Sequence, residues 1–541
     1  MAAAPAFKLK GVRFRYRDSD PWLFDGLSLY LGRGKYLGLM GRSGSGKSTL
    51  VSLLSGIAPS MTGGELQGDI EVCGTTLPAP LTQVSSIESV VFQAPEEMFV
   101  QERVGDEISF SLRARGMDRG EAHRRCGKAV SDLGIEGLIH RRTRDLSGGE
   151  QTLVAVAAAV VTDPGLLVLD EPSSELDPLS RSRLMKGIRA LRERRPEMSV
   201  LQIEQDMSSL FLCDEVAVLR AGRIGIQGPP GRTFRDRGGL ERSGLATAPI
   251  FTTSLLAEER KLGAFRDCPL RRLPVALGDG LKGKLPPLRP EKDLENTRTG
   301  KLLLEEVSFH YPGTMAGISD IDLDLSKERS VAIMGPNGSG KSTLGKLICG
   351  LMPPDRGSVI SDDVPFHLFQ KPSNMFFEMT VGLEAELGGI EKEVMRKLGL
   401  YSLFGSDPLL LSEGEKQRLG IALALSFKGR AVVLDEPFKG LDGPMRELVW
   451  GMLGSYGAPA HILITNDPEV AGRCERLVLL KGGRPIADGR PEEVLNDMGP
   501  MAALGWAMPV PGVVARRAGA GKVSSFGPVI KALEGMKGGA K

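Results

Sequence analysis

The sequence predicts an α/β protein built from two tandem copies of one domain, each with a buried parallel sheet. Three segments occur twice in the same order: a glycine-rich loop ending in Lys-Ser, a Leu-Ser-x-Gly-Glu segment, and an apolar run ending in Asp-Glu-Pro. Their positions are 41–48 and 335–342, 146–150 and 411–415, and 166–172 and 431–437. A fixed order of three segments in both halves of a chain indicates a tandem repeat.

The composition is that of a globular protein, and it excludes several function classes. Of 541 residues, 41% are hydrophobic and 25% charged, which is enough to bury a core. Lys plus Arg (69) nearly balances Asp plus Glu (67), so the chain is not built mainly to bind nucleic acid. The six cysteines are scattered without zinc or disulfide spacing. Without a secretory signal or an 18-residue apolar run, we expect a cytoplasmic chain.

Composition also divides the chain. We expect the first copy at 1–228 and the second at 301–495. Residues 229–300 are rich in proline and glycine, which break helices and strands, so we expect a linker or a loose subdomain there. Residues 496–541 form a C-terminal extension whose basic end we expect to be mobile.

The glycine-rich loops follow apolar strands and precede helices that begin Lys-Ser-Thr-Leu, the context of a phosphate-binding loop. Glycines let backbone N–H groups surround a phosphate, and the helix N-terminus adds its positive end. The lysine would reach the β- and γ-phosphates, and the serine hydroxyl would bind Mg²⁺. The predicted ATP-binding residues are Gly41, Ser43, Gly44, Gly46, Lys47, Ser48 and Thr49 in the first copy, and Gly335, Asn337, Gly338, Gly340, Lys341, Ser342 and Thr343 in the second.

The apolar runs read as buried parallel strands with acidic residues at the carboxyl end, where such sheets bind ligands. Asp170 and Asp435 are predicted to hold Mg²⁺ through its water shell. Glu171 and Glu436 are predicted to polarise the attacking water as general bases.

Because Leu-Ser-x-Gly-Glu precedes a long apolar helix, the chain resembles the ATP-binding cassette (ABC) ATPases over roughly 1–228 and 300–495. The resemblance implies two P-loop NTPase domains, each with a RecA-like core and an inserted helical subdomain. It also implies that the cassettes pair head to tail. Each ATP would then lie between the phosphate loop of one cassette and the signature segment of the other.

The resemblance also implies roles for residues outside the loops. An aromatic would stack on adenine, a glutamine would sense the γ-phosphate and Mg²⁺, the signature Ser and Gly would contact ATP, and an aspartate would couple the two sites. The matching residues are Tyr16 and Tyr311, Gln93 and Gln370, Ser147, Gly149, Ser412 and Gly414, and Asp177 and Asp442.

The chain departs from the family pattern where a histidine usually contacts the γ-phosphate. Gln205 and Asn466 stand there, and their amides donate hydrogen bonds but carry no charge. We expect both to act in catalysis, and both sites to hydrolyse ATP. Glu413 replaces the first signature glycine, and Thr152-Leu153 stands where the second copy has Gln-Arg, so the sites are not equivalent.

The segment that follows Gln93 resembles the ATPases of energy-coupling factor (ECF) transporters. It contains Phe-Gln-x-Pro, Phe99 and then Val-x-x-Glu-Ile-x-Phe, and the second copy echoes it after Gln370. This resemblance implies a peripheral ATPase on the cytoplasmic face of the membrane that drives uptake of a vitamin or a transition-metal ion. Its partners would be a transmembrane coupling protein and a substrate-binding protein. A tandem ATPase of a sugar importer, a soluble ATPase acting on ribosomes and a non-hydrolysing regulator remain alternatives.

Overall fold

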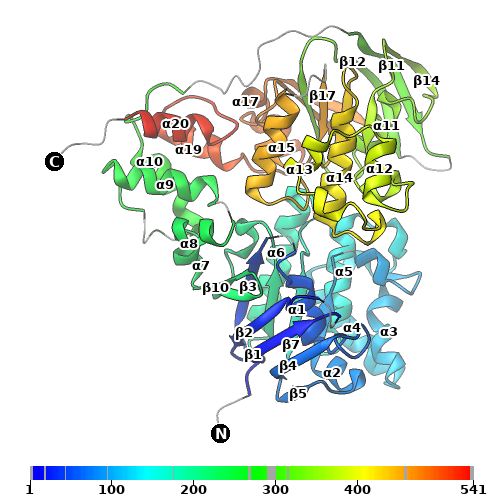
Figure 1. Cartoon of the computed structure of the whole chain (residues 1–541), viewed down its shortest axis with the longest axis vertical. Helices are drawn as coiled ribbons and strands as arrows, with labels where there is room; N and C mark the ends of the chain where they lie inside the picture. Colours follow the sequence, from blue (N-terminus) through cyan, green and yellow to red (C-terminus); the bar gives the residue numbers. More distant parts are fainter. Residues whose placement is uncertain are drawn as a thin grey trace. The chain divides into compact units, whose positions relative to one another are not determined.

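The computed structural model describes residues 4–17, 20–42, 44–93, 95–174, 176–245, 247–265, 268, 270–288, 300–312, 316–455 and 460–536. The chain divides into two compact units, Met1–Thr247 and Ala248–Lys541. Figure 1 shows the elements of each unit in the colours of the sequence. Within the described ranges, every helix is too short or too polar to cross a lipid bilayer.

The first unit is built on a six-stranded sheet with the order β10-β9-β3-β8-β7-β6. Its strands are parallel except for the antiparallel pair of β9 and β10. Strands β3, β7 and β8 are buried along their whole length, as the continuous apolar sequences of β3 and β7 predict. The strand bounds are β3 Tyr36–Gly41, β6 Glu88–Val91, β7 Leu166–Asp170, β8 Ser199–Ile203, β9 Glu215–Arg220 and β10 Arg223–Gly228.

A second, antiparallel sheet with the order β2-β1-β4-β5 contributes to the same core. Phe14 and Phe24 from this sheet join one apolar cluster with Leu50 of the first helix and Ile203 of β8. That helix therefore packs against both sheets, which fixes the direction in which its N-terminus points. The strands are β1 Phe7–Arg15, β2 Phe24–Leu31, β4 Glu65–Val72 and β5 Thr75–Leu77.

The helices of the first unit include an inserted group between β6 and β7, which is the expected helical subdomain. In that group α3 packs against α4 and α5. The bounds are α1 Lys47–Leu54, α2 Leu81–Ile87, α3 Val104–Ala114, α4 Arg119–Leu133, α5 Gly148–Val160, α6 Pro178–Arg194, α7 Pro230–Thr233 and α8 Arg237–Arg242.

The second unit repeats the six-stranded sheet of the first in the same topology, and its antiparallel sheet has three strands instead of four. Its six-stranded sheet has the order β15-β16-β17-β13-β18-β19, and a separate sheet has the order β12-β11-β14. The strands are β11 Leu302–His310, β12 Gly317–Asp324, β13 Ser330–Met334, β14 Arg356–Ser361, β15 Phe366–Leu368, β16 Val432–Asp435, β17 His461–Ile464, β18 Arg476–Lys481 and β19 Arg484–Gly489. The predicted pair of α/β domains is confirmed.

The helical insertion of the second unit is shorter, as the closer spacing of its motifs indicates. The helix equivalent to α4 has 6 residues instead of 15. The helices are α11 Lys341–Ile348, α12 Val381–Leu387, α13 Lys392–Lys397, α14 Glu413–Ser426, α15 Gly443–Ser455, α16 Pro468–Ala471, α17 Pro491–Val494 and α18 Met498–Ala503.

The linker and the C-terminal extension differ from our expectation, because they fold together within the second unit. Linker helices α9 (Pro249–Glu259) and α10 (Leu273–Gly280) pack against α20 (Gly527–Gly535) and α19 (Val510–Ala518), respectively. Leu277 of α10, Val514 of α19, and Val529 and Leu533 of α20 are fully buried in this four-helix cluster, so residues 515–536 are folded rather than mobile. The end at 537–541 and linker residues 289–299 lie outside the described residues.

Candidate functional site

The glycine-rich loop of each unit connects a buried central strand to a helix that begins at the motif lysine. Gly46 and Gly340, the residues before these lysines, have φ angles of 100° and 98°. A Cβ on Gly46 would lie 2.7 Å from the Phe24 ring, and one on Gly340 would lie 2.6 Å from Ile318. Glycine is required at both positions, because the loop turns tightly against the antiparallel sheet.

Both motif lysines are buried and donate to backbone carbonyls of their own loops. Lys47 Nζ donates to the oxygens of Gly41 and Arg42 at 2.9 and 3.0 Å. Lys341 Nζ donates to Gly335 and Pro336 at 2.7 and 3.1 Å. Burial lowers the pKa of Lys47. Each loop therefore holds a cation at a helix N-terminus, an arrangement that attracts phosphate.

The residue after each lysine meets the aspartate at the end of the neighbouring strand. Ser48 hydrogen-bonds Asp170, and Ser342 hydrogen-bonds Asp435. Burial, with a smaller contribution from Glu171, raises the pKa of Asp170 to about 6, and burial also raises the pKa of Asp435. A hydroxyl beside a carboxylate supplies the oxygen ligands that Mg²⁺ prefers, so these pairs fit that ion.

The two glutamates that follow have the same backbone conformation. Glu171 and Glu436 both have φ of 48°, in the left-handed region that residues other than glycine seldom adopt. Their amides donate to Ile203 and Ile464, respectively, at 3.0 and 2.8 Å. These bonds join each glutamate to the end of the adjacent strand, where Gln205 and Asn466 begin the next turn.

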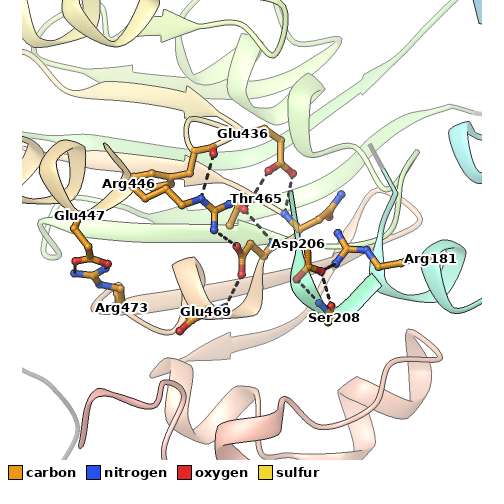
Figure 2. A network of polar contacts seen from close by, with 12 residues as sticks. Arg181, Asp206, Ser208, Glu436, Arg446, Glu447, Thr465, Glu469 and Arg473 are labelled. Carbon is orange, nitrogen blue, oxygen red and sulfur yellow. Dashed lines mark hydrogen bonds and ion pairs between the residues drawn. The ribbon is translucent and has the colours of Figure 1, made fainter. Parts of the chain in front are cut away.

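The contacts of the two carboxylates differ. Gln205 Nε2 donates to both Glu171 oxygens, at 2.9 and 3.2 Å. Glu436 instead accepts from the Thr465 hydroxyl at 3.2 Å and from the backbone N–H of Asn466 at 2.8 Å (Figure 2). Burial raises the pKa of Glu436 to about 7.

The side chain of Asn466 reaches the phosphate loop rather than the glutamate. Its Nδ2 donates to Asn337 Oδ1 at 3.1 Å. Gln205 and Asn466 therefore both lie just beyond the end of a central strand, β8 or β17. Only Gln205 contacts its glutamate through the side chain.

The aromatic residues expected beside adenine lie close to the loop helices. Tyr16 Oη is 3.0 Å from Thr49 Oγ1, and Tyr311 Oη is 3.3 Å from Thr343 Oγ1. Gln93 is half-buried just after β6, and Gln370 is exposed just after β15. Both follow the sheet edge next to the strand that carries the aspartate.

The serine of each Leu-Ser-x-Gly-Glu segment caps the following helix. Ser147 and Glu150 form a capping box at the start of α5, and Ser412 and Glu415 form one at the start of α14. In the first unit, a Cβ on Gly149 would lie 2.4 Å from Ser180 Cβ. Gly149 therefore lets the signature pack against the start of α6.

Asp177 and Asp442 lie at the starts of the helices that follow the Asp-Glu strands. Asp177 accepts from the N–H groups of Leu179 and Ser180, both at 2.9 Å, and Asp442 accepts from Met445 N at 3.0 Å. Gly44 and Gly338 have positive φ angles within their loops. Gly414 lies beside Gly440 in the turn that precedes Asp442. Ser43 lies outside the described residues.

A comparison with protein families matches a range of residues in each unit. The model of the ABC transporter family matches residues 24–174 and 318–439, which together make up half of the chain. The chain belongs to the ABC transporter family. Each unit is thus an ATP-binding cassette, and the chain binds and hydrolyses ATP.

Relatives align with nearly the whole chain. A relative from Methanosarcina acetivorans, named as an ABC transporter ATP-binding protein, is 27% identical over 94% of this chain and 89% of its own length. YkoD of Bacillus subtilis, named for HMP/thiamine import, is 27% identical over 90% of this chain and 91% of its own. The solved structure of RNase-L Inhibitor shares the fold with a TM-score of 0.57 at 21% identity, covering 92% and 93% of the two chains.

The chain is therefore an ATP-binding subunit of an ABC transporter, and it works with transmembrane subunits.

Three residues that contact the glutamate turns or their neighbours were not predicted from the sequence. Thr465 was overlooked because only the next residue is diagnostic in this family. Gln417, noted from the sequence only as a difference between the two copies, donates to Pro437 O at 3.1 Å. This contact and the burial of Glu204 were not predicted because only the fold reveals the partners of these two residues.

Proposed function

We propose that this chain powers an ECF-type transporter that imports a vitamin or a transition-metal ion. The observation that carries the proposal is the segment after Gln93, whose Phe-Gln-x-Pro and Val-x-x-Glu-Ile-x-Phe pattern is echoed in the second cassette. The likeness to YkoD, named for HMP/thiamine import, supports a vitamin or its precursor as cargo. A tandem ATPase of a sugar importer is the second candidate, and an ATPase acting on ribosomes is the third.

In each cassette, ATP would bind the phosphate loop, with the tyrosine beside adenine and the glutamate as general base. Ser48 and Asp170 would hold Mg²⁺ in the first cassette, and Ser342 and Asp435 in the second, with Gln93 and Gln370 nearby. The ion would neutralise charge on the phosphates. We further propose that the cassettes pair head to tail, so that Ser412 and Gly414 complete the first site and Ser147 and Gly149 complete the second.

An apolar groove in the second cassette suits the docking of a transmembrane subunit on the cytoplasmic face of the membrane. The groove has a volume of about 440 Å³ and lies directly beyond Gln370. Phe377, 82% exposed, and Leu387, 63% exposed, line it. Their position next to the proposed γ-phosphate sensor would let ATP binding move a docked helix. In the first cassette, Phe99 is half-buried and Phe110 is exposed on the matching segment.

Purification of the chain from its own cells in mild detergent tests the proposal. Small polytopic membrane proteins should copurify, and the one that binds a small molecule should reveal the cargo. Phe377→Asp should abolish copurification, because a buried carboxylate in an apolar contact is costly. Tyr30→Asp, at an exposed aromatic on β2, is the matched control and should retain the partners. Copurification of ribosomes would reject the transporter assignment proposed here.

A further inference from the structure

Glu204 is a fully buried carboxyl in the first cassette that the proposed chemistry does not use. It directly follows β8 and directly precedes Gln205, the residue that contacts Glu171. Only 2% of its surface is exposed. A carboxyl at such a position must be neutral or paired with a cation, because an isolated buried charge is very costly.

The hydrogen bonds around Glu204 form a continuous chain across the core. Tyr36 Oη donates to Gln202 Oε1, and Gln202 Nε2 donates to Glu204 Oε1 at 3.0 Å. Glu204 also bonds Ser173, whose hydroxyl is 3.1 Å from that of Ser209. A protonated Glu204 can form both of its hydrogen bonds, because its O–H donates to Ser173 while its carbonyl oxygen accepts from Gln202.

The second cassette shows that the fold does not require these polar groups. Glu204 and Thr465 are equivalent, since their amides donate to Leu39 and Ile333, respectively, both at 3.1 Å. The residues of the second cassette that match Gln202, Ser173 and Ser209 are apolar and buried: Leu463, Phe438 and Val470. A buried polar network costs more than such apolar packing, so its presence in one cassette calls for a functional reason.

The hydrogen bond between Glu204 and Ser173 joins the two backbone segments that carry Gln205 and Glu171. Glu204 is the residue before Gln205, and Ser173 lies two residues beyond Glu171 in the turn that follows β7. We propose that neutral Glu204 positions Glu171 and Gln205 for hydrolysis in the first cassette, and that its ionisation switches this site off at alkaline pH. The inference rests on the proposed role of Glu171 as general base.

The charges around Glu204 oppose its ionisation. Burial raises the pKa of Glu204 to about 8 and outweighs the hydrogen bonds with Ser173 and Gln202, which lower the pKa. The negative charges of Asp206 and Glu171 raise it further. Asp206 is itself paired with Arg181 at 2.8 Å (Figure 2). Tyr36 and Cys213 also face Glu204, and burial raises the pKa of both. Arg192 lies over the Tyr36 ring and pairs with Asp214 at 2.9 Å.

Infrared spectroscopy of the full chain tests the protonation state directly. The difference spectrum between the wild-type chain and Glu204→Gln should contain the band of one protonated carboxylic acid near pH 7. That band should disappear with a midpoint near pH 8. Its absence at neutral pH would show that Glu204 is already ionised and would overturn the inference.

Turnover then tests the positioning role, in a chain whose second site is disabled by Lys341→Ala. One pH unit above the midpoint leaves about a tenth of Glu204 neutral, so kcat should fall about tenfold without a matching change in KM. Glu204→Gln should remove this alkaline loss, because an amide makes the same two hydrogen bonds. Glu204→Thr should lower kcat at every pH. A chain with Lys47→Ala, which reports the second site, should lack the alkaline step.

The outcomes separate this inference from the proposed function. If Glu171→Gln leaves turnover of the first site unchanged, the role of Glu171 is wrong and the inference falls with it. Suppose instead that Glu171→Gln abolishes turnover, but that kcat of Glu204→Gln falls at alkaline pH as much as kcat of the chain with Glu204. The positioning role of Glu204 alone is then wrong.

Discussion

Gln205 and Asn466 show how one residue changes the surroundings of a glutamate. Both stand at the position that follows the end of a central strand by two residues, yet only the longer Gln205 side chain reaches its glutamate. In the second cassette Thr465 and a backbone amide replace that contact, and Asn466 binds Asn337. The two cassettes thus hold their glutamates by different means.

We expect alanine at these two positions to have unequal effects on hydrolysis. Gln205→Ala should lower turnover of the first site about tenfold, the rate equivalent of one hydrogen bond to a charged group. Asn466→Ala should change turnover of the second site much less, because Glu436 keeps both of its contacts. Steady-state ATPase assays in chains with the other site disabled by Lys341→Ala or Lys47→Ala measure this. Equal losses would contradict the geometry.

Two buried histidines make the second unit sensitive to acid. Burial lowers the pKa of His367 and His461 to about 4 from the ordinary 6.5. Unfolded histidine binds a proton below about 6.5, whereas these folded rings do so only near 4, so the free energy of unfolding should decrease across that window as pH falls. Above 6.5 this contribution is fully present.

Tryptophan fluorescence can follow this loss. Trp22→Phe leaves only Trp450 and Trp506, both in the second unit, as reporters. Urea unfolding of that variant should be measured at several pH values. The urea concentration at the unfolding midpoint should decrease as the pH falls below 6.5. Replacing His461 with Gln should flatten the dependence, while His310→Gln, at an exposed histidine of the same unit, should not.

At the scale of elements, the signature helices differ in how they hold the turn after the Asp-Glu strand. Gln417 of α14 is 3% exposed and donates to the carbonyls of Glu436 and Pro437 at 3.4 and 3.1 Å. Thr152 of α5 turns back to Gly148 O of its own helix, at 3.0 Å. Among the residues that the structure describes, the helix side chain at this position therefore contacts the glutamate turn only in the second cassette.

Removing this contact should destabilise one cassette only. Gln417→Ala leaves the buried carbonyl of Pro437 without this donor, whereas Glu436 O keeps the N–H of Lys439 at 3.1 Å. We therefore expect it to lower the free energy of unfolding of the second unit by about 1–3 kcal/mol. Thr152→Ala should have little effect, because a hydroxyl bonded within its own helix contributes little there. Denaturant unfolding of both variants provides the comparison, and a similar loss in both would contradict it.

The elements proposed to bind phosphate were predictable from sequence, whereas the packing around them was not. Lys47, Ser48 and Asp170 meet as expected because a strand, a tight loop and a helix leave their motif no other geometry. The contact of Asn466 with Asn337 joins residues 129 positions apart, and no local pattern encodes it. Glu204 resembles a solvent-facing acid in sequence, because the hydrogen-bond chain that contains it extends to Tyr36, Ser173 and Ser209 in three other segments.

For the whole molecule, the linker misled sequence reasoning for a related physical reason. Proline opens α9 and α10 at the start of each helix, where the missing N–H costs nothing. Gly278 faces α19 closely, since a Cβ there would lie 2.6 Å from Arg517 Cβ. Residues that usually break helices thus allow two distant segments to pack within one unit.

We expect the linker helices to depend on the C-terminal extension. A chain ending at residue 509 lacks α19 and α20 and exposes Leu277 of α10 and Phe251 of α9, which are fully buried in the whole chain. Limited proteolysis should cut 249–280 much faster in that chain. A chain ending at residue 536 is the control and should resist like the wild type. Equal cleavage of all three would show that the linker folds alone.

The four-helix cluster also determines which elements would bear a mechanical force applied at residue 536. Arg260 binds the carbonyls of Leu533 and Glu534 at 3.2 and 3.3 Å, and Arg517 pairs with Asp279 at 3.0 Å. A pull on residue 536, for example from an immobilising tag, would therefore be carried first by α9 and α10, before it reached the sheet that carries Asp435. The end of α20 is thus a suitable anchoring point for single-molecule measurements on this ATPase.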